Sequence, residues 1–427
     1  MWGVCASRAV DSSSNTRNAR QWRDAQPSRP GISTILFFMK SRYIKMGFSE
    51  AIKGRIPYEV RYVLVLFLVT RLLLLGIGIY SHIQLAPYHY HAYVWRYSEN
   101  MILDMWGVWD TGWYLNIAEH GYTKELIPDY PKMIGADQRN YAFFPLYPYL
   151  MKAVSIITGD AFVSGLIVSN AAFIASAVLL YRLVRIDYGE SMGLRSVKYM
   201  FLFPVAFIFS GVLSESLYLL LAVAAFYHAK KGNWMMAGLT GFLLSLTRSL
   251  GALIIVPLVA EYLGRGDYKR GEAKQDAYYL ALIPCGLMLF MAFNHYLTGD
   301  FLAFKHIQAA WGRHLMNPLG QLVFGTVIQR TNALFASYFA VISLILFISY
   351  KREIGLPYTL FGLYSILIPL TMGFMSMPRF TLVLFPLYII MARIGENSRY
   401  DQVLTFSSAM LQGFLMVLWS NGFTLVI

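Results

Sequence analysis

The feature that most restricts the fold is a repeated succession of apolar runs long enough to cross a bilayer. A membrane-spanning helix needs about 17–25 apolar residues. The clearest runs of this length are 61–81, 161–184, 277–297, 331–350, 357–375 and 403–423. Only 14% of the 427 residues are charged, whereas soluble domains average about 25%. The sequence therefore predicts an all-α membrane protein that crosses the bilayer many times.

Other apolar tracts are interrupted by polar residues. Residues 198–229 and 234–264 each resemble a pair of short helices, broken at Ser214-Glu215-Ser216 and at Thr247-Arg248-Ser249. A last short run, 379–394, follows Met377-Pro378-Arg379. We interpret 143–158 as a membrane-surface segment.

The orientation follows from the basic residues. Residues 1–61 hold eleven Lys/Arg and four Asp/Glu, and positive charge beside a membrane helix marks the cytoplasmic side. With the N-terminus inside, every later connection predicted to lie inside is also basic. The pattern requires that 143–158 does not span, and it gives about eleven crossings with the C-terminus outside. Two long loops, 82–142 and 298–330, then lie outside.

The domain organisation is equally simple. We expect a basic, partly disordered cytoplasmic tail over 1–60 and one polytopic domain over 61–427. The Ser- and Arg-rich start indicates a tail, or an upstream start codon with Met39 or Met46 as the true start. The net charge of +13 is concentrated in this tail, whereas nucleic-acid binding needs a basic face on a folded domain. We therefore expect membrane lipids as partners and no nucleic acid.

The first outer loop contains a candidate catalytic carboxylate, Asp110, between Trp109 and the pair Trp113-Tyr114. Their spacing predicts a short amphipathic helix, ended by Gly121. Two interpretations remain open. Asp110 could cap the helix while the Trp side chains anchor it at the interface, or it could face a cavity as a general base.

Four further charged residues lie at the outer ends of spans or in the outer loops: Glu215, Arg248, Arg313 and Arg379. Charges at membrane depth are costly and tend to mark function. Each one alone could instead extend its head group to the interface. All four are predicted to lie on the same side of the membrane, which favours a common site. A transporter would instead place its polar residues near the midplane.

From Trp109-Asp110 to Gly121-Tyr122, and then at Phe143-Phe144-Pro145, the chain resembles the PIG-V mannosyltransferases. The resemblance continues through Ser214-Glu215-Ser216-Leu217, Leu246 to Gly251, Thr298-Gly299-Asp300, Trp311-Gly312-Arg313 and Pro378-Arg379-Phe380. It implies a GT-C-type bundle whose active site faces away from the cytosol. It also implies a polyprenyl-phosphate sugar donor, usually mannose, a glycan or glycolipid acceptor, and inversion at the anomeric carbon.

The resemblance assigns roles to residues. Asp110 is the expected base and Asp104 the second choice. The leaving phosphate needs charge stabilisation, which arginine supplies well, so Arg248, Arg313 and Arg379 are the candidates. Substrate contacts are also expected from Trp109, Trp113, Tyr114, His120, Phe144 and Glu215. His120 is structural or faces the acceptor.

No cofactor is implied, and no His/Asp cluster has the spacing of metal ligands. Two other functions remain open: a transporter or flippase of lipid-linked saccharides, and a non-catalytic scaffold. The cell membrane is the expected location, with the endoplasmic reticulum as the alternative.

Overall fold

The computed structural model describes residues 56–85, 97–125, 137–264, 275–318, 320, 331–374 and 376–423. The tail over 1–55 lies outside the described residues. The helices below belong to one compact unit, Tyr58–Ile427. Every regular element of the described residues is an α-helix or a 3-10 helix, which confirms the all-α prediction.

Within the part of the chain that the structure describes, five segments are long and apolar enough to cross a membrane. Helices α3 (Tyr58–Leu85), α7 (Ala161–Leu202), α14 (Thr331–Ile354) and α18 (Ser398–Ser420) provide four of them. The fifth, Asp276–Thr298, combines η5 (Gln275–Ala281) with α11 (Leu282–Thr298). Other apolar helices are shorter, so the protein is multi-pass but the expected count of about eleven crossings stays a prediction.

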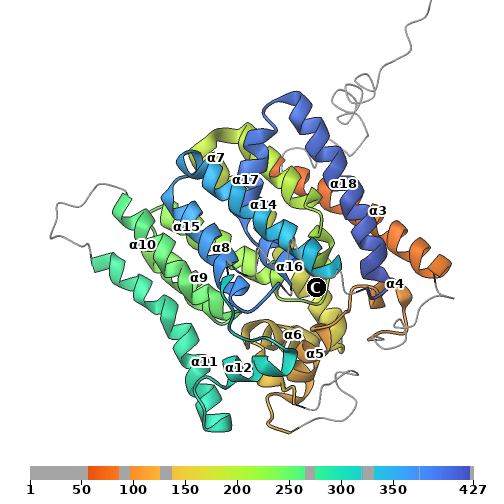
Figure 1. The fold of residues 1–427 in the computed structure, drawn as a ribbon, viewed down its shortest axis with the longest axis vertical. Coiled ribbons are helices and arrows are strands. Elements are labelled where there is room, and N and C mark those ends of the chain that lie inside the picture. The colour runs from red at the N-terminus through yellow and green to blue at the C-terminus, as the bar shows by residue number, and fades with distance from the viewer. Residues whose placement is uncertain are drawn as a thin grey trace, which may run out of the picture. The chain divides into compact units, whose positions relative to one another are not determined.

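A second group of helices in the bundle is shorter. They are α8 (Glu215–Lys230), α9 (Trp234–Ser245), η4 (Ser249–Ile254), α10 (Ile255–Gly264), α15 (Leu356–Leu370), α16 (Met377–Leu382) and α17 (Phe385–Ile394). The predicted breaks are confirmed, because α8 begins at Glu215 and Arg248 lies between α9 and η4. In Figure 1, α3 and α18 lie side by side at one edge of the bundle, and α11 lies at the opposite edge.

Helix α7 differs from the prediction. Residues 185–197 were expected as a connection between two spans, but they are helical, and the chain changes direction only at Gly189. This residue has φ 83°, a conformation that costs glycine little and other residues much more. The connection between these two spans is therefore helical on both sides of a turn at Gly189.

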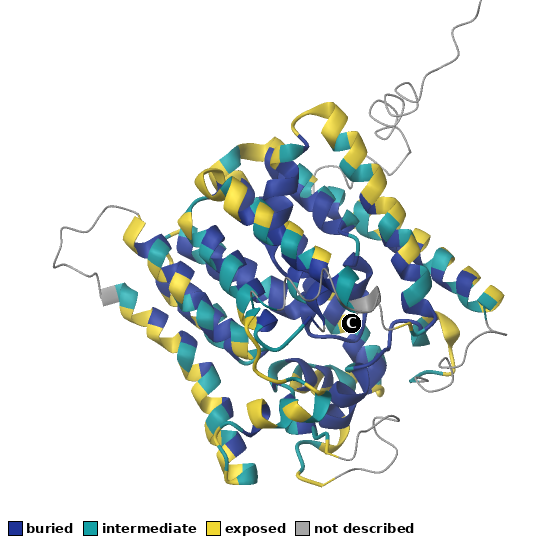
Figure 2. Ribbon diagram, in the orientation of Figure 1, coloured by how far each residue is buried: buried dark blue, intermediate teal, exposed yellow. Residues whose placement is uncertain are grey.

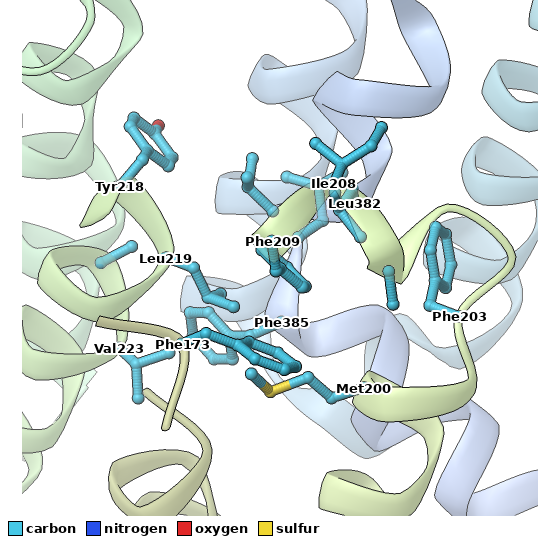
Figure 3. Close-up of a cluster of buried hydrophobic side chains, with 14 of the residues drawn as sticks. Phe173, Met200, Phe203, Ile208, Phe209, Tyr218, Leu219, Val223, Leu382 and Phe385 are labelled. Atoms are coloured by element: carbon cyan, nitrogen blue, oxygen red, sulfur yellow. The ribbon is translucent and has the colours of Figure 1, made fainter. Parts of the chain in front are cut away.

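The connection between α7 and α8 is the most deeply buried segment of the bundle. It contains η3 (Ala206–Ser210), and residues 205–219 are all buried. Figure 2 shows this dark-blue centre and the exposed outer faces of α3, α11 and α18. Figure 3 shows its apolar packing, in which Phe209 lies among side chains of α7, α8, α16 and α17.

A buried non-helical backbone must have its polar groups satisfied. Arg71 of α3 donates from Nη2 to the Ala206 carbonyl at 2.8 Å and from Nε to Ser210 Oγ at 2.7 Å. Gln412 of α18 donates to the carbonyls of Phe201 and Phe203. The flanking helices therefore fix the connection that leads to Glu215.

Charged residues of the predicted inner connections also pair with one another. Lys230 contacts Asp187 at 3.0 Å and Glu261 at 3.2 Å, and Arg393 contacts Glu353 at 2.9 Å. These contacts link α8 to α7 and α10, and α17 to α14. They agree with one shared end for the connections that the basic pattern groups together.

The short elements of the outer loops gather elsewhere. They are α4 (Met101–Asp104), α5 (Thr111–His120), η2 (Asn140–Ala142), α6 (Leu146–Thr158), α12 (Ala303–His306) and η6 (Ile307–Trp311). Helix α6 covers most of the predicted surface segment, and it packs Tyr147 and Met151, both 0% exposed, into the core. Figure 1 shows α5, α6 and α12 together at one end of the bundle.

Candidate active site

Asp110 lies directly before the first turn of α5. Asp110 occupies the N-cap position, but its side chain makes no capping hydrogen bond. Its Oδ2 instead pairs with Arg379 Nη1 of α16 at 2.8 Å. The capping interpretation is therefore wrong for this side chain. The helix ends as predicted, since Gly121 with φ 78° donates its N–H to the Ile117 carbonyl.

A single carboxylate oxygen joins the two central arginines. Glu215 Oε1 accepts from Arg379 Nε and from Arg248 Nη2, each at 2.6 Å. Glu215 is 0% exposed, and its second oxygen, Oε2, is buried without a hydrogen-bond partner. The result is a continuous ion chain from Asp110 through Arg379 and Glu215 to Arg248. It brings together residues from four separate segments of the sequence.

Hydroxyl groups extend this chain. Arg248 Nε donates to Ser214 Oγ at 3.2 Å, and Ser214 Oγ lies 2.9 Å from the Tyr114 hydroxyl. Tyr114 is buried on α5, one turn after Asp110. The ion chain therefore begins at Asp110 and ends at Tyr114, both at α5. This fixes the distance between Asp110 and the arginine pair.

Arg313 supplies a further positive charge to the site. Its Nη1 donates to Gln308 Oε1 at 3.1 Å, and no described carboxylate forms an ion pair with it. Burial lowers the pKa of Arg313, and repulsion by Arg379 and Arg248 adds to this while Asp110 opposes it. Three arginines thus face two carboxylates, Asp110 and Glu215. The surplus cation favours an anionic ligand.

An aromatic wall joins the two outer loops. The Trp113 ring stacks on Phe143 at 5.7 Å and meets Trp311 edge-on at 5.7 Å. Trp113 is 6% exposed, and Thr111 to Ala118 of α5 are all buried. Trp113 is therefore a packing residue of the protein interior, and the interpretation of it as an interfacial anchor is wrong.

Three residues that the sequence predicted for the site are not part of the ion chain. Asp104 Oδ1 accepts from the backbone N–H groups of Tyr97 and Ser98, so it braces its own loop. His120 ends α5 and is exposed. Phe144 packs with Phe290 and Phe304 in a separate aromatic cluster.

The sequence interpretation missed residues that support the site. Phe143 and Trp311 belong to the motifs of the resemblance, but the sequence predicts no role for them. Ser214 belongs to a predicted polar interruption and to a motif of the resemblance, but no role is predicted for it. Asn140 was not singled out, although its Nδ2 donates to Asn116 Oδ1 at 2.7 Å and to the Gly121 carbonyl at 3.0 Å. Among the described residues, no group of three His, Cys, Asp or Glu side chains could hold a metal ion.

Comparison with known protein families shows the family to which the chain belongs. Residues 52–263, about half of the chain, match the family model described as "Mannosyltransferase (PIG-V)". The chain belongs to the PIG-V mannosyltransferase family. The match includes Asp110, Glu215 and Arg248, and it favours an enzyme over the transporter and scaffold alternatives.

Solved structures are also similar to this chain. One is an Archaeoglobus fulgidus oligosaccharyltransferase tethered with an acceptor peptide, with 11% identity over 85% of this chain and 55% of that chain, and a TM-score of 0.42. Another is the same organism's AglB with an inhibitory peptide and a dolichol-phosphate, with 10% identity over 85% and 56%, and a TM-score of 0.39. The chain thus spans about half the length of these structures. No curated protein matches the chain.

Proposed function

We propose that this mannosyltransferase moves mannose from a polyprenyl-phosphate donor to a glycan or glycolipid acceptor, with inversion, on the non-cytoplasmic face of the cell membrane. The observation that carries the proposal is the ion chain in which Arg379 pairs with the Asp110 carboxylate, while one buried glutamate holds both Arg379 and Arg248. It combines a base and an anion site in one place, as a transfer from a sugar phosphate requires.

Asp110 serves as the general base. One carboxylate oxygen, Oδ2, is fixed by Arg379, while no described residue hydrogen-bonds the other oxygen, Oδ1. The side chain is 27% exposed, so an acceptor can reach it. The acceptor hydroxyl oxygen attacks the anomeric carbon, and Asp110 takes the hydroxyl proton. The bond from that carbon to the phosphate oxygen breaks, and polyprenyl phosphate leaves with the electron pair.

The arginines stabilise the leaving phosphate. Charge grows on the phosphate as its bond to carbon breaks, and preorganised cations stabilise such charge most strongly in a water-poor site. Arg248 is 16% exposed at its side chain and Arg379 5%, so Arg248 and the partly exposed Arg313 contact the phosphate more directly. Arg379 orients Asp110.

Glu215 acts as a positioning residue. With 0% exposure, its carboxylate lies behind the arginines and has no surface for substrate. Its shared oxygen sets the distance between Arg248 and Arg379. Buried ion pairs offset their desolvation only when their geometry is good, so this arrangement resists rearrangement when the phosphate arrives.

The test uses purified protein in lipid nanodiscs with radiolabelled polyprenyl-phosphate mannose and a lipid extract of the host membrane as the acceptor source. The wild-type protein should transfer label to a lipid or glycan product. Asp110→Asn keeps the side-chain size and should lower the transfer rate on the order of a hundredfold or more.

Asp104→Asn is the matched control, because Asp104 contacts its own loop, and it should lower transfer much less. Donor binding, measured by protection of labelled donor from extraction, should survive in Asp110→Asn. Near-normal transfer by Asp110→Asn would show that Asp110 is not the base. Absence of any transfer by the wild-type protein would reject the donor assignment.

A further inference from the structure

We propose that Trp419, near the end of α18, is a positioning residue that holds the turn containing Trp109 and Asp110 in the geometry needed for mannose transfer. The inference rests on the proposed role of Asp110 as the base. It assigns a role in the site to the last described helix, which lies outside the residues that the family model matches.

The turn before Asp110 is strained. Trp109 has φ 46°, and among the described residues only Trp109 and Ser376 are non-glycine residues with positive φ. Such a conformation is unfavourable for residues with a Cβ and persists only when the surrounding structure enforces it. Trp109 directly precedes Asp110, and Ser376 is the N-cap of the helix that carries Arg379. The two strained positions therefore flank the Asp110–Arg379 ion pair.

Trp419 supplies an enforcing contact on the Asp110 side. Its ring meets the Trp109 ring edge-on, with centroids 5.2 Å apart and planes at 84°. Its indole Nε1–H donates to the Met105 carbonyl at 2.9 Å. Trp419 is itself 0% exposed, so one rigid side chain contacts the segment on either side of Gly107.

The other side of Trp419 rests on the buried connection that leads to Glu215. Its ring lies 5.3 Å from Phe207 in η3, and a Cβ at Gly211 would lie 3.3 Å from its Cζ2. The turn is also tied to this connection directly, since Val212 N–H donates to the Trp106 carbonyl at 3.0 Å. Trp419 is thus packed between the segment that carries the base and the segment that precedes Glu215.

The contacts predict a separable effect on catalysis. Without the Trp419 ring, the Trp109 turn can relax to negative φ, and Asp110 then moves away from its place beside Arg379. Glu215 still holds Arg248 and Arg379, so donor binding persists. Loss of Trp419 should therefore lower kcat while the KM for the donor stays nearly constant, because geometry at the base acts on the transition state.

The experiment compares Trp419→Leu, Trp419→Phe and Leu415→Ala in nanodiscs. Leu415 is 0% exposed, lies one helical turn before Trp419, and is not part of the site. We expect Trp419→Leu to lower kcat at least tenfold with donor KM changed less than twofold. Trp419→Phe retains an aromatic ring and should recover part of the rate. Leu415→Ala should lower thermal stability without this selective loss of kcat.

A second readout does not depend on activity. Protein labelled with 5-fluorotryptophan gives a fluorine resonance for Trp109, assigned with Trp109→Phe. This resonance should shift or broaden in Trp419→Leu and remain in place in Leu415→Ala. An unmoved resonance, or equal kcat losses in Trp419→Leu and Leu415→Ala, would overturn the proposal. If Asp110→Asn proves active, the proposed base fails, and the resonance still decides whether Trp419 holds the turn.

Discussion

Replacing Glu215 by Gln tests how the site binds an anion. The substitution keeps the size of the side chain but removes the negative charge that two arginines share through one oxygen. The formal charge of Asp110, Glu215, Arg248, Arg313 and Arg379 then rises from 3 − 2 = +1 to 3 − 1 = +2. Charge alone would make donor phosphate bind more tightly, whereas loss of positioning would make it bind less tightly.

The structure favours loss of positioning. Removing one partner of a buried ion pair costs about 3–5 kcal/mol, because the remaining charge is left uncompensated. Gln still accepts a hydrogen bond, which places the cost near the lower value. Its amide N–H group would take the place of Oε2, a buried atom that has no hydrogen-bond partner, and an unsatisfied buried donor costs about 1–3 kcal/mol. Arg248 and Arg379 would separate to reduce both penalties.

We therefore expect Glu215→Gln to raise donor KM about tenfold and to lower thermal stability, since about 1.4 kcal/mol of lost binding is a factor of ten. Steady-state kinetics with labelled donor and thermal unfolding in detergent measure the two effects. Glu261→Gln is the matched control: Glu261 is also buried and pairs with Lys230 at another cluster, so it should lose stability alone. An unchanged or lower donor KM in Glu215→Gln would refute the positioning role.

Three further outcomes are expected. Gly251→Ala should lower stability and transfer together, because its Cβ would lie 2.3 Å from the Leu244 carbonyl oxygen; differential scanning measures the first effect. Asp300 accepts a backbone hydrogen bond from Leu302, which lowers its pKa. Its stabilisation is therefore complete above the ordinary value of about 3.9 and is lost as the pH falls through the lowered pKa. The difference in unfolding temperature between wild type and Asp300→Ala should accordingly shrink in acid. An impermeant thiol reagent should label a cysteine at Asn317 from outside intact cells and not one at Glu396, and the reverse would invert the orientation.

The apolar pattern predicted much of the bundle, because the residues of each helix are apolar where that helix faces lipid or the protein interior. Breaks at Glu215 and Arg248 were visible since polar residues interrupt otherwise apolar tracts. The turn in α7 was not visible, because Gly189 is one of many glycines and only the folded backbone shows its positive φ. The buried α5 was also misjudged as interfacial, since spacing shows which residues share a face but not what covers that face.

The sequence predicted which residues form the site, but it did not predict which of them contact one another. An acidic residue before a helix suits both an N-cap and a base, and only the contact with Arg379 separates the two. That contact spans most of the chain, and local spacing carries no information about it. Trp419 gave no sequence signal at all, because a buried Trp in an apolar helix resembles ordinary core packing.

The ion chain also links the assembly of the bundle to its chemistry. Arg379 and Glu215 are almost fully buried, and an unpaired charge in such surroundings is strongly unfavourable. Each charge is compensated only when α5, α8, α16 and the break after α9 have come together. The arrangement that aligns the base with the arginines is therefore the arrangement in which these buried charges are paired. A partly assembled bundle would leave Glu215 or Arg379 unpaired, so selection for a folded protein and selection for an aligned site act on the same contacts.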